Sequence, residues 1–232
     1  MKFVWAALVC GAALIVVAIV VGQPAAERGG TRAGSDTSSK DRGSALDFSR
    51  RDADDVTAQG RADAPVVIIE YADYRCPFCA VFDQETLPEL VKRYVEQGRV
   101  RFEWRDLPIF GEQSDAAAVA ARAAGEQGMF WEYHTALFAA APERGHAELP
   151  RERLVEFARQ IGVPNIDRFT EDLDSQELAQ RVRADYEEGA NLGISSTPMF
   201  LVNGTPIAGA QPLAVFLDVI NAELAKAERH AE

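Results

Sequence analysis

The stretch that decides the fold runs from residue 66 to residue 79 and reads VVIIEYADYRCPFC. It begins with VVIIEY at residues 66–71, a nearly continuous run of apolar and β-branched residues that predicts a strand covered on both faces. Cys76 and Cys79 follow, with two residues between them. The apolar spacing beyond them predicts a helix, so the order is strand, turn, cysteine pair, helix.

A second strand extends this order to a β-α-β unit. Apolar residues from Leu87 to Val95 recur at helical spacing, and Pro88 within them predicts a kink. Residues 99–107 alternate between apolar and polar side chains, which predicts a strand.

The remainder is mostly helical and ends in a hairpin and a helix. Residues 112–192 predict a block of helices. Met199–Val202 and Pro206–Ala208 predict short strands joined by Asn203-Gly204, a pair typical of hairpin turns. Pro212 is placed to open a final helix. The whole order predicts one mixed α/β domain with a helical insertion, and not two independent domains.

The amino-terminal part of the chain differs from this domain. Residues 3–22 are apolar and uncharged, and about 20 such residues span a bilayer as a helix. We expect residues 1–22 to form an uncleaved membrane anchor, with a cleaved signal peptide as the alternative. Residues 23–60 contain few large apolar side chains, so we expect a flexible linker there and the folded domain at residues 61–232.

The composition excludes two classes of protein. The 232 residues include 36 acidic and 24 basic side chains, a formal net charge of −12, which argues against a nucleic-acid-binding protein. A chain of this length with three cysteines is not a disulfide-stapled scaffold. Cys10 lies within the apolar segment, so the expected domain contains only Cys76 and Cys79.

The position of this cysteine pair indicates redox chemistry. A sulfur at a helix start faces unpaired backbone N–H groups and the positive end of the helix dipole, which stabilises the reactive thiolate. Pro77 suits a first helical turn, and Phe78 adds no charge. A zinc or iron–sulfur site needs about four ligands, which this domain does not offer in matching pairs, so we expect no metal. A purely structural disulfide remains an alternative.

Three stretches of the chain resemble the DsbA-like branch of the thioredoxin superfamily, thiol–disulfide oxidoreductases with a helical insertion. They are EYADYRCPFC at residues 70–79, FWEYHTALF at residues 130–138 and STPMFLVNG at residues 196–204. The resemblance extends over residues 61–228. It implies a thioredoxin-like fold, β-α-β and β-β-α, with the helical insertion between the two halves.

The resemblance also implies roles for matching residues. Cys76 would be the nucleophile, and Cys79 the buried partner that resolves a mixed disulfide. Thr197-Pro198 matches the cis-proline loop, which lies beside the cysteines and pairs with the substrate backbone. Glu70 matches a buried acid that moves protons for the second cysteine, and an outward-facing or salt-bridged glutamate is the alternative.

We therefore expect a single-pass membrane protein whose domain is extracytoplasmic, or a secreted one if the amino terminus is cleaved. It would donate a Cys76–Cys79 disulfide to reduced or misoxidised exported proteins. This disulfide would be its only redox group, and no cofactor would be needed. The resemblance implies a membrane partner that reoxidises it. A reductase or isomerase using the same residues is one alternative, and a non-enzymatic partner-binding module is another.

Two further expectations concern single residues. The strongly oxidising members of the family carry histidine where this chain has Phe78. We therefore expect the redox potential of the cysteine pair to be less oxidising than the roughly −120 mV of DsbA, but above the roughly −270 mV of thioredoxin. His134, within FWEYHTALF, is expected to be a packed helix residue and not a ligand.

Overall fold

The computed structural model describes residues 47–142 and 144–231 of the chain. The anchor expected at residues 1–22 lies outside these ranges. Among the helices that are described, none combines the length and the apolar character needed to cross a membrane.

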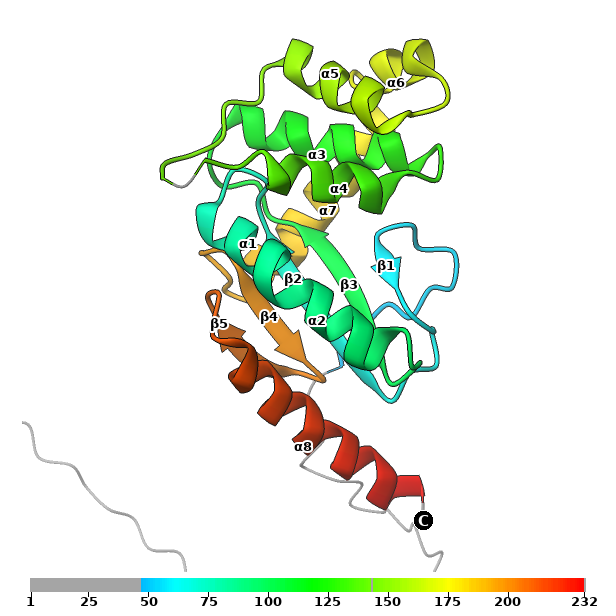
Figure 1. Cartoon of the computed structure of the whole chain (residues 1–232), viewed down its shortest axis with the longest axis vertical. Helices are drawn as coiled ribbons and strands as arrows, with labels where there is room; N and C mark the ends of the chain where they lie inside the picture. The colour runs from blue at the N-terminus through cyan, green and yellow to red at the C-terminus, as the bar shows by residue number, and fades with distance from the viewer. Residues whose placement is uncertain (1–46, 143, 232) are drawn as a thin grey trace, which may run out of the picture. The chain divides into compact units, whose positions relative to one another are not determined.

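One mixed sheet, with the strand order β1-β3-β2-β4-β5, forms the centre of the described part (Figure 1). β2 (Val66–Ala72) and β3 (Val100–Asp106) run parallel. β4 (Met199–Val202) pairs antiparallel with β2, and β5 (Thr205–Ala208) with β4. β1 (Ala58–Gln59) is added antiparallel to the outer edge of β3. Every residue of β2 is buried, as its continuous apolar run predicts. Every residue of β3 is also buried, including the charged side chains that alternate with its apolar ones.

Helices cover both faces of this sheet. After β2 the chain forms α1 (Pro77–Val81) and α2 (Leu87–Leu90), joined and extended by the π-helical turns η1 (Phe82–Thr86) and η2 (Val91–Val95). α2, the two π-helical turns and α8 (Leu213–Ala231) share one apolar core with the sheet, whereas Cys79 and Ala80 of α1 pack with the helical insertion. The helix predicted to kink at Pro88 is interrupted by a π-helical turn on each side of this residue, which lacks the N–H that an α-helical turn needs.

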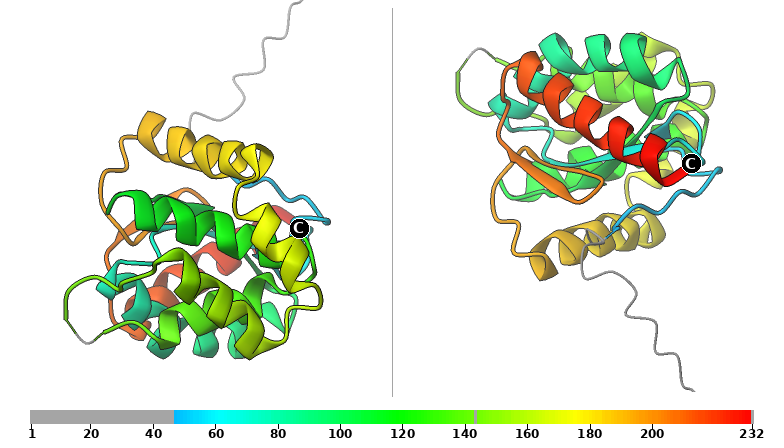
Figure 2. Two further views of the ribbon diagram at one scale, coloured as in Figure 1. Left: turned by 90° about the horizontal axis from the view of Figure 1, so that it is seen from above. Right: turned by 90° about the horizontal axis from the view of Figure 1, so that it is seen from below.

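The predicted helical insertion lies between β3 and β4. It consists of α3 (Glu112–Gly125), α4 (Phe130–Ala139), α5 (Arg151–Ile161), α6 (Ile166–Asp172) and α7 (Gln176–Asn191). The alanine-rich α3 is buried over most of its length and contacts α4 and α7. α7 contacts β3 and lies on the side of the sheet opposite α8 (Figure 2). The fold class predicted from the sequence, α/β with a thioredoxin-like sheet and a helical insertion, is confirmed.

Residues 47–60 belong to the folded domain, so this part of the predicted linker is wrong. The backbone N–H groups of Arg50 and Arg51 donate to the Glu103 carboxylate at 3.0 and 2.9 Å, and the Arg50 guanidinium pairs with Asp185 at 2.7 Å. Glu103 and Asp185 are buried and need such partners. Hydrogen bonds and ion pairs hold this segment on the domain, and the scarcity of apolar residues does not reveal them. The domain therefore begins before residue 61.

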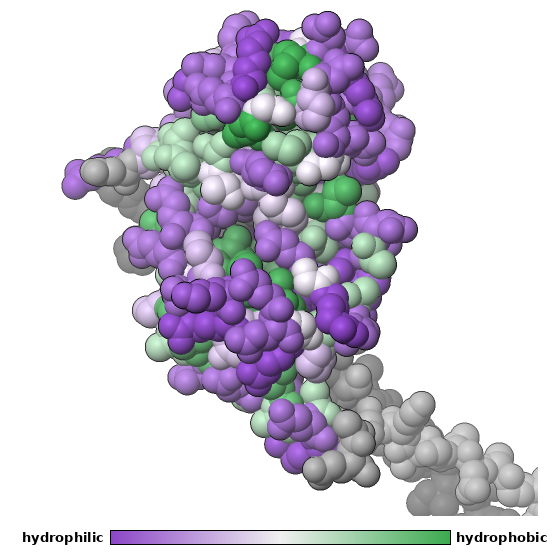
Figure 3. All heavy atoms as spheres, turned by 45° about the vertical axis from the view of Figure 1, so that its right-hand side comes forward, coloured by the Kyte–Doolittle hydropathy of each residue, from purple (hydrophilic) through white to green (hydrophobic). Residues whose placement is uncertain are grey.

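Most residues on the face shown in Figure 3 are hydrophilic. On the face shown in Figure 3, apolar residues form separate small patches among hydrophilic ones. The most exposed large apolar side chain among the described residues is Phe78, with 64% of its surface exposed. The excess of acidic side chains is therefore consistent with a solvated surface and identifies no partner.

Candidate active site

The cysteine pair lies at the junction of β2 and α1, as the sequence predicts. Cys76 is the N-cap of α1 and Pro77 is its first residue, where a missing N–H removes no helical bond. The backbone N–H of Cys76 donates to the Asp73 carbonyl at 3.0 Å, and the Cys76 carbonyl accepts from the Ala80 N–H at 3.2 Å. These bonds fix the turn that presents the first cysteine at the helix start.

Asp73 and Arg75 brace this turn. The Asp73 carboxylate accepts from the backbone N–H groups of Arg75 and Ile109, each at 2.7 Å, and from that of Phe110 at 3.2 Å. The Arg75 guanidinium donates to the carbonyls of Phe110 and Ala147 at 2.6 and 2.7 Å. Both side chains therefore tie the turn to the loops that precede and follow the first helices of the insertion.

The Cys76 sulfur lies in a setting that favours the thiolate. The pKa of Cys76 is lowered to about 6, and the largest cause is a hydrogen bond from the Cys79 thiol. Burial acts in the opposite direction. Thr197 and the backbone N–H groups of Phe78 and Cys79 add to the lowering. The Cys76 sulfur is 3.4 Å from the Thr197 carbonyl oxygen. The Thr197 hydroxyl is buried and has no hydrogen-bond partner among the described residues, so it is free to donate to a thiolate at Cys76.

Cys79 has the opposite character. It is fully buried, and burial raises the pKa of its thiol well above the ordinary value. The hydrogen bond to Cys76 and the charges of Cys76 and Glu70 raise it further. Both cysteines are free thiols in the structure. The negative charge of the reduced pair therefore lies on Cys76.

Glu70 lies in β2 beneath the cysteines, with 2% of its surface exposed. Its neighbours across the sheet are Trp104 and Phe200, which carry no charge. Burial raises the pKa of Glu70 well above the ordinary value, and the charges of Asp83 and Cys76 raise it further. The structure thus excludes the outward-facing alternative, and among the described residues no basic side chain forms a salt bridge with Glu70.

The peptide bond between Thr197 and Pro198 is cis, as the resemblance implies. The loop leads into β4, beside the strand that ends at the active-site turn. The hairpin that follows turns at Asn203 and Gly204, with φ angles of 45° and 83°. This sharp turn returns the chain as β5 along β4.

Sequence reasoning missed one residue of the site, Asp83. It is buried in η1, four residues after Cys79, and accepts a hydrogen bond from His134 at 2.8 Å. The i, i+4 spacing from Cys79 is the available signal, because it places both residues on one helical face. His134 is a packed residue of α4, as predicted, but it also has this polar partner.

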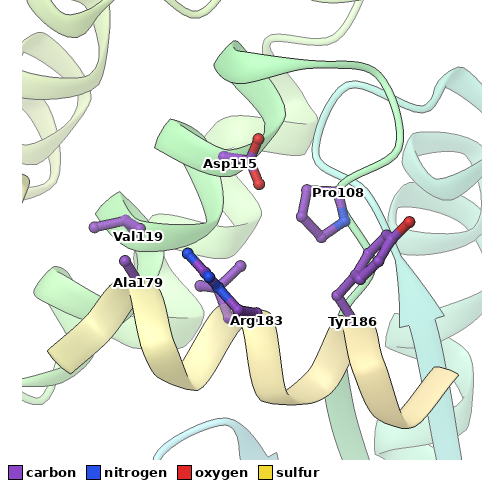
Figure 4. Close-up of a pocket in the computed structure, with 7 residues that line it drawn as sticks. Pro108, Asp115, Val119, Ala179, Arg183 and Tyr186 are labelled. Atoms are coloured by element: carbon purple, nitrogen blue, oxygen red, sulfur yellow. The ribbon is translucent and has the colours of Figure 1, made fainter. Parts of the chain in front are cut away.

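A separate hollow of about 450 Å³ lies between α3 and α7 (Figure 4). Its lining includes Pro108, Asp115, Arg183 and Tyr186, and none of the predicted site residues. The reacting sulfurs therefore do not face this hollow. No cluster of three or more metal-ligating side chains occurs in the described ranges of the chain.

Comparisons with known proteins agree with this geometry. A family model described as "Thioredoxin" matches residues 52–222. The chain is 30% identical over 149 residues to the probable disulfide bond formation protein D of Bacillus anthracis. This match covers 62% of this chain and 68% of that protein. It is 37% identical over 155 residues to the Na(+)/H(+) antiporter NhaA 3 of Salinispora tropica, but this match covers 66% of the chain and only 22% of the antiporter.

Among solved structures, the fold is similar to the crystal structure of oxidised BdbD from Bacillus subtilis. The TM-score is 0.68 at 27% identity, and the match covers 73% of this chain and 92% of that one. The family match, the named relative and the shared fold agree with the cysteine pair at the helix start. The chain therefore belongs to the thioredoxin family, as a DsbA-like thiol–disulfide oxidoreductase.

Proposed function

We propose that this chain is a membrane-tethered oxidase that donates a Cys76–Cys79 disulfide to reduced exported proteins. The observation that carries the proposal is the difference between the two thiols. The pKa of Cys76 is lowered to about 6 while burial raises that of Cys79, so one sulfur is a good leaving group and the other is shielded.

The proposed reaction begins with the oxidised pair. A substrate thiolate attacks the Cys76 sulfur, a mixed disulfide forms, and the Cys76–Cys79 bond breaks with its electron pair on Cys79. The Glu70 carboxyl, which burial keeps protonated, gives its proton to the Cys79 thiolate. A second substrate thiolate then attacks the substrate sulfur of the mixed disulfide, and Cys76 leaves as a thiolate. The substrate has lost two electrons and the enzyme has gained them.

Two features beside the sulfur would hold the substrate. The cis-proline loop of Thr197 and Pro198 lies next to Cys76 and offers backbone groups to an extended chain. Phe78 and Val81 expose apolar surface on the same helix as the cysteines. An unfolded substrate offers both free backbone groups and apolar side chains, so both features fit this class.

The proposed location follows from redox chemistry and from the amino-terminal sequence. Exported proteins need disulfides, whereas cytosolic thiols are kept reduced. The apolar residues 3–22 would anchor the domain on the extracytoplasmic side, or direct its secretion if they are cleaved. A membrane partner would then reoxidise the cysteine pair after each turnover.

Trapping tests the mechanism. In Cys79→Ala the Cys76 thiolate can still attack a disulfide of an exported protein, but the neighbouring sulfur that would attack the resulting mixed disulfide and release the substrate is absent. Mixed disulfides on Cys76 should therefore accumulate in cells and be released by reductant. The double variant Cys76→Ser/Cys79→Ala is the matched control and should trap nothing. Equal labelling of both variants, or no trapped species in either, would contradict the proposal. A partner-binding module without activity predicts instead that Cys76→Ser keeps its full biological effect.

A further inference from the structure

A hollow of about 540 Å³ lies against the helix that carries the cysteines. One of its walls is α1, and the other is formed by residues that follow α4. Most of its lining is apolar and consists of Pro77, Phe78, Ala80, Val81, Ala141 and Pro142. The polar residues of the lining are Gln84 and Arg144. The hollow is thus an apolar site next to the reacting sulfurs.

α1 leaves two large apolar side chains uncovered at this hollow. Phe78 is 64% exposed and Val81 is 43% exposed, whereas Cys79 and Ala80 between them are buried. Phe78 and Val81 are three positions apart, so they lie on the same face of the helix. Among the described residues, five large apolar side chains are more than a third exposed, and two of them line this hollow. Such uncovered apolar surface is typical of a place where another molecule binds.

Hydrogen bonds hold both walls of the hollow in place. The Gln84 amide donates to the Phe138 carbonyl at 2.6 Å and so joins η1 to α4. Further along the chain, the Arg75 guanidinium donates to the Ala147 carbonyl at 2.7 Å, and the Arg75 carbonyl accepts from Nδ1 of His146 at 2.9 Å. An incoming chain therefore meets a hollow that is already formed, which lowers the entropic cost of binding.

The hollow and the cis-proline loop lie on different sides of Cys76. The Thr197 carbonyl oxygen is 3.4 Å from the Cys76 sulfur, but neither Thr197 nor Pro198 belongs to the lining of the hollow. The lining begins instead at Pro77. Figures 1 and 2 show the start of α1 between the segment that leads into β4 and the loop that follows α4. A chain bonded to the Cys76 sulfur therefore has the cis-proline loop in one direction and the hollow in the other.

We propose that this hollow is a specificity site, which takes an apolar side chain of the substrate from one side only of the reacting cysteine. Aromatic and branched aliphatic side chains are the class that fits, because the lining is mostly apolar and an aromatic ring gains further from contact with Phe78. The proposal rests on the proposed function in one respect, namely that the occupant belongs to a protein substrate. No bond forms or breaks in the hollow, so it affects the capture of a substrate and not the exchange chemistry.

Two peptides of identical composition test the one-sided preference. Each contains one cysteine and one phenylalanine, which precedes the cysteine in one peptide and follows it in the other. The full-length oxidised protein, in lipid nanodiscs, is mixed with excess peptide, and mass spectrometry after acid quenching gives the rate of its reduction. Two peptide thiols join in a disulfide, and the Cys76–Cys79 pair gains their two electrons. One peptide should react about tenfold faster than the other, the effect of burying one apolar side chain.

Variants of the two walls assign this preference to the hollow. Val81→Ser removes methyl groups from the lining and should reduce the ratio of the two rates at least about threefold, close to the effect of one buried methylene. Val215→Ser is the matched control, because Val215 is 37% exposed on α8 and does not line the hollow. Ala141→Phe adds a ring to the opposite wall, should reduce the ratio in the same way, and decides the question if Val81→Ser does not fold. A ratio is used because altered reactivity of Cys76 itself affects both peptides equally.

Several outcomes would overturn the inference. They are equal rates for the two peptides, a ratio that survives in both Val81→Ser and Ala141→Phe, and a ratio that falls as much in Val215→Ser. Sedimentation tests the other occupant, a second copy of the chain, and a dimer that is lost in Val81→Ser would also overturn the inference. Trapping by Cys79→Ala is independent of these rates. Trapped species with equal peptide rates would remove only the inference, and a hollow-dependent ratio without trapped species would remove only the proposed function.

Discussion

At Cys76, the largest stabilisation of the thiolate comes from the thiol beside it. Alkylation of the reduced protein by iodoacetamide should therefore show a midpoint at about pH 6. Replacing the neighbour, in Cys79→Ala, removes the principal hydrogen bond and should move the midpoint upward by one or more pH units, toward the ordinary value of about 8.5. Mass spectrometry of the alkylated site is the measurement. A Cys79→Ala midpoint still at about 6 would assign the effect to the helix start and Thr197 instead.

The same thiolate predicts the redox potential. A lowered pKa at Cys76 stabilises the reduced enzyme and makes the disulfide more oxidising. The pKa of about 6 lies between the roughly 3.5 of DsbA and the roughly 7 of thioredoxin. Equilibration with glutathione should therefore give a potential between about −270 and −120 mV. A value at the thioredoxin end would favour a reductase over the proposed oxidase.

Glu70 predicts how stability depends on pH. Burial raises its pKa in the folded state, so the folded protein holds a proton that the unfolded chain has already released. The free energy of unfolding should therefore fall as the pH rises from about 4.5, the value for the unfolded chain, through the folded-state pKa. Glu70→Gln removes this loss, so its stability relative to the unchanged protein should increase with pH. Urea unfolding at pH 5 and pH 8 measures this, and a constant difference would contradict a raised pKa.

At the scale of elements, the active-site turn depends on one carboxylate that links β2 to the loop after β3. Asp73→Ala leaves three backbone N–H groups without their acceptor, and we expect it to cost about 2–4 kcal/mol of stability. Asp63→Ala is a suitable control, because its pair with Arg61 is exposed on both sides and its loss should leave stability nearly unchanged. Denaturant midpoints compare the two variants. Equal effects would show that Asp73 does not hold the turn.

Some elements follow from local sequence and others do not. The helix start at Cys76-Pro77 and the hairpin turn at Asn203-Gly204 are determined by residues adjacent in the chain, and both were predicted. The π turns around Pro88 have no comparable local pattern. The bond between Asp83 and His134 joins residues 51 positions apart, so it exists only once α4 packs on η1. The sequence therefore predicts the cysteine pair and the acid beneath it, but not the second carboxyl.

On the scale of the whole molecule, the amino-terminal segment completes a buried network of charges. Burial opposes ionisation of Glu103, but hydrogen bonds from Arg101 and from the backbone N–H groups of Arg50 and Arg51 outweigh it and bring the pKa of Glu103 to about 2. Arg101 also donates to the Gly60 carbonyl at 3.3 Å. Sequence patterns based on apolar spacing do not detect such a network, so the domain boundary was predicted too late in the chain.

Two fragments test this boundary. A fragment that begins at Asp47 keeps every bond of the segment and should unfold with the stability of the full chain. A fragment that begins at Arg61 leaves Glu103 without its backbone donors and Asp185 without Arg50, and breaking one buried pair costs about 3–5 kcal/mol. Its melting temperature should fall by more than 10 °C, if it folds at all. Equal melting temperatures would restore the boundary at residue 61.

The contacts that Arg50 and Arg51 make with β3 and α7 have a mechanical consequence. A force applied to the chain ahead of residue 47 is borne first by the bonds of these two arginines to Glu103, Asp185 and Glu188. The pairing of β1 with β3 must then also break before the load reaches β2, which leads directly into the cysteine turn. These contacts therefore attach the segment to β3 and α7, and not to the strand that leads into the cysteine turn.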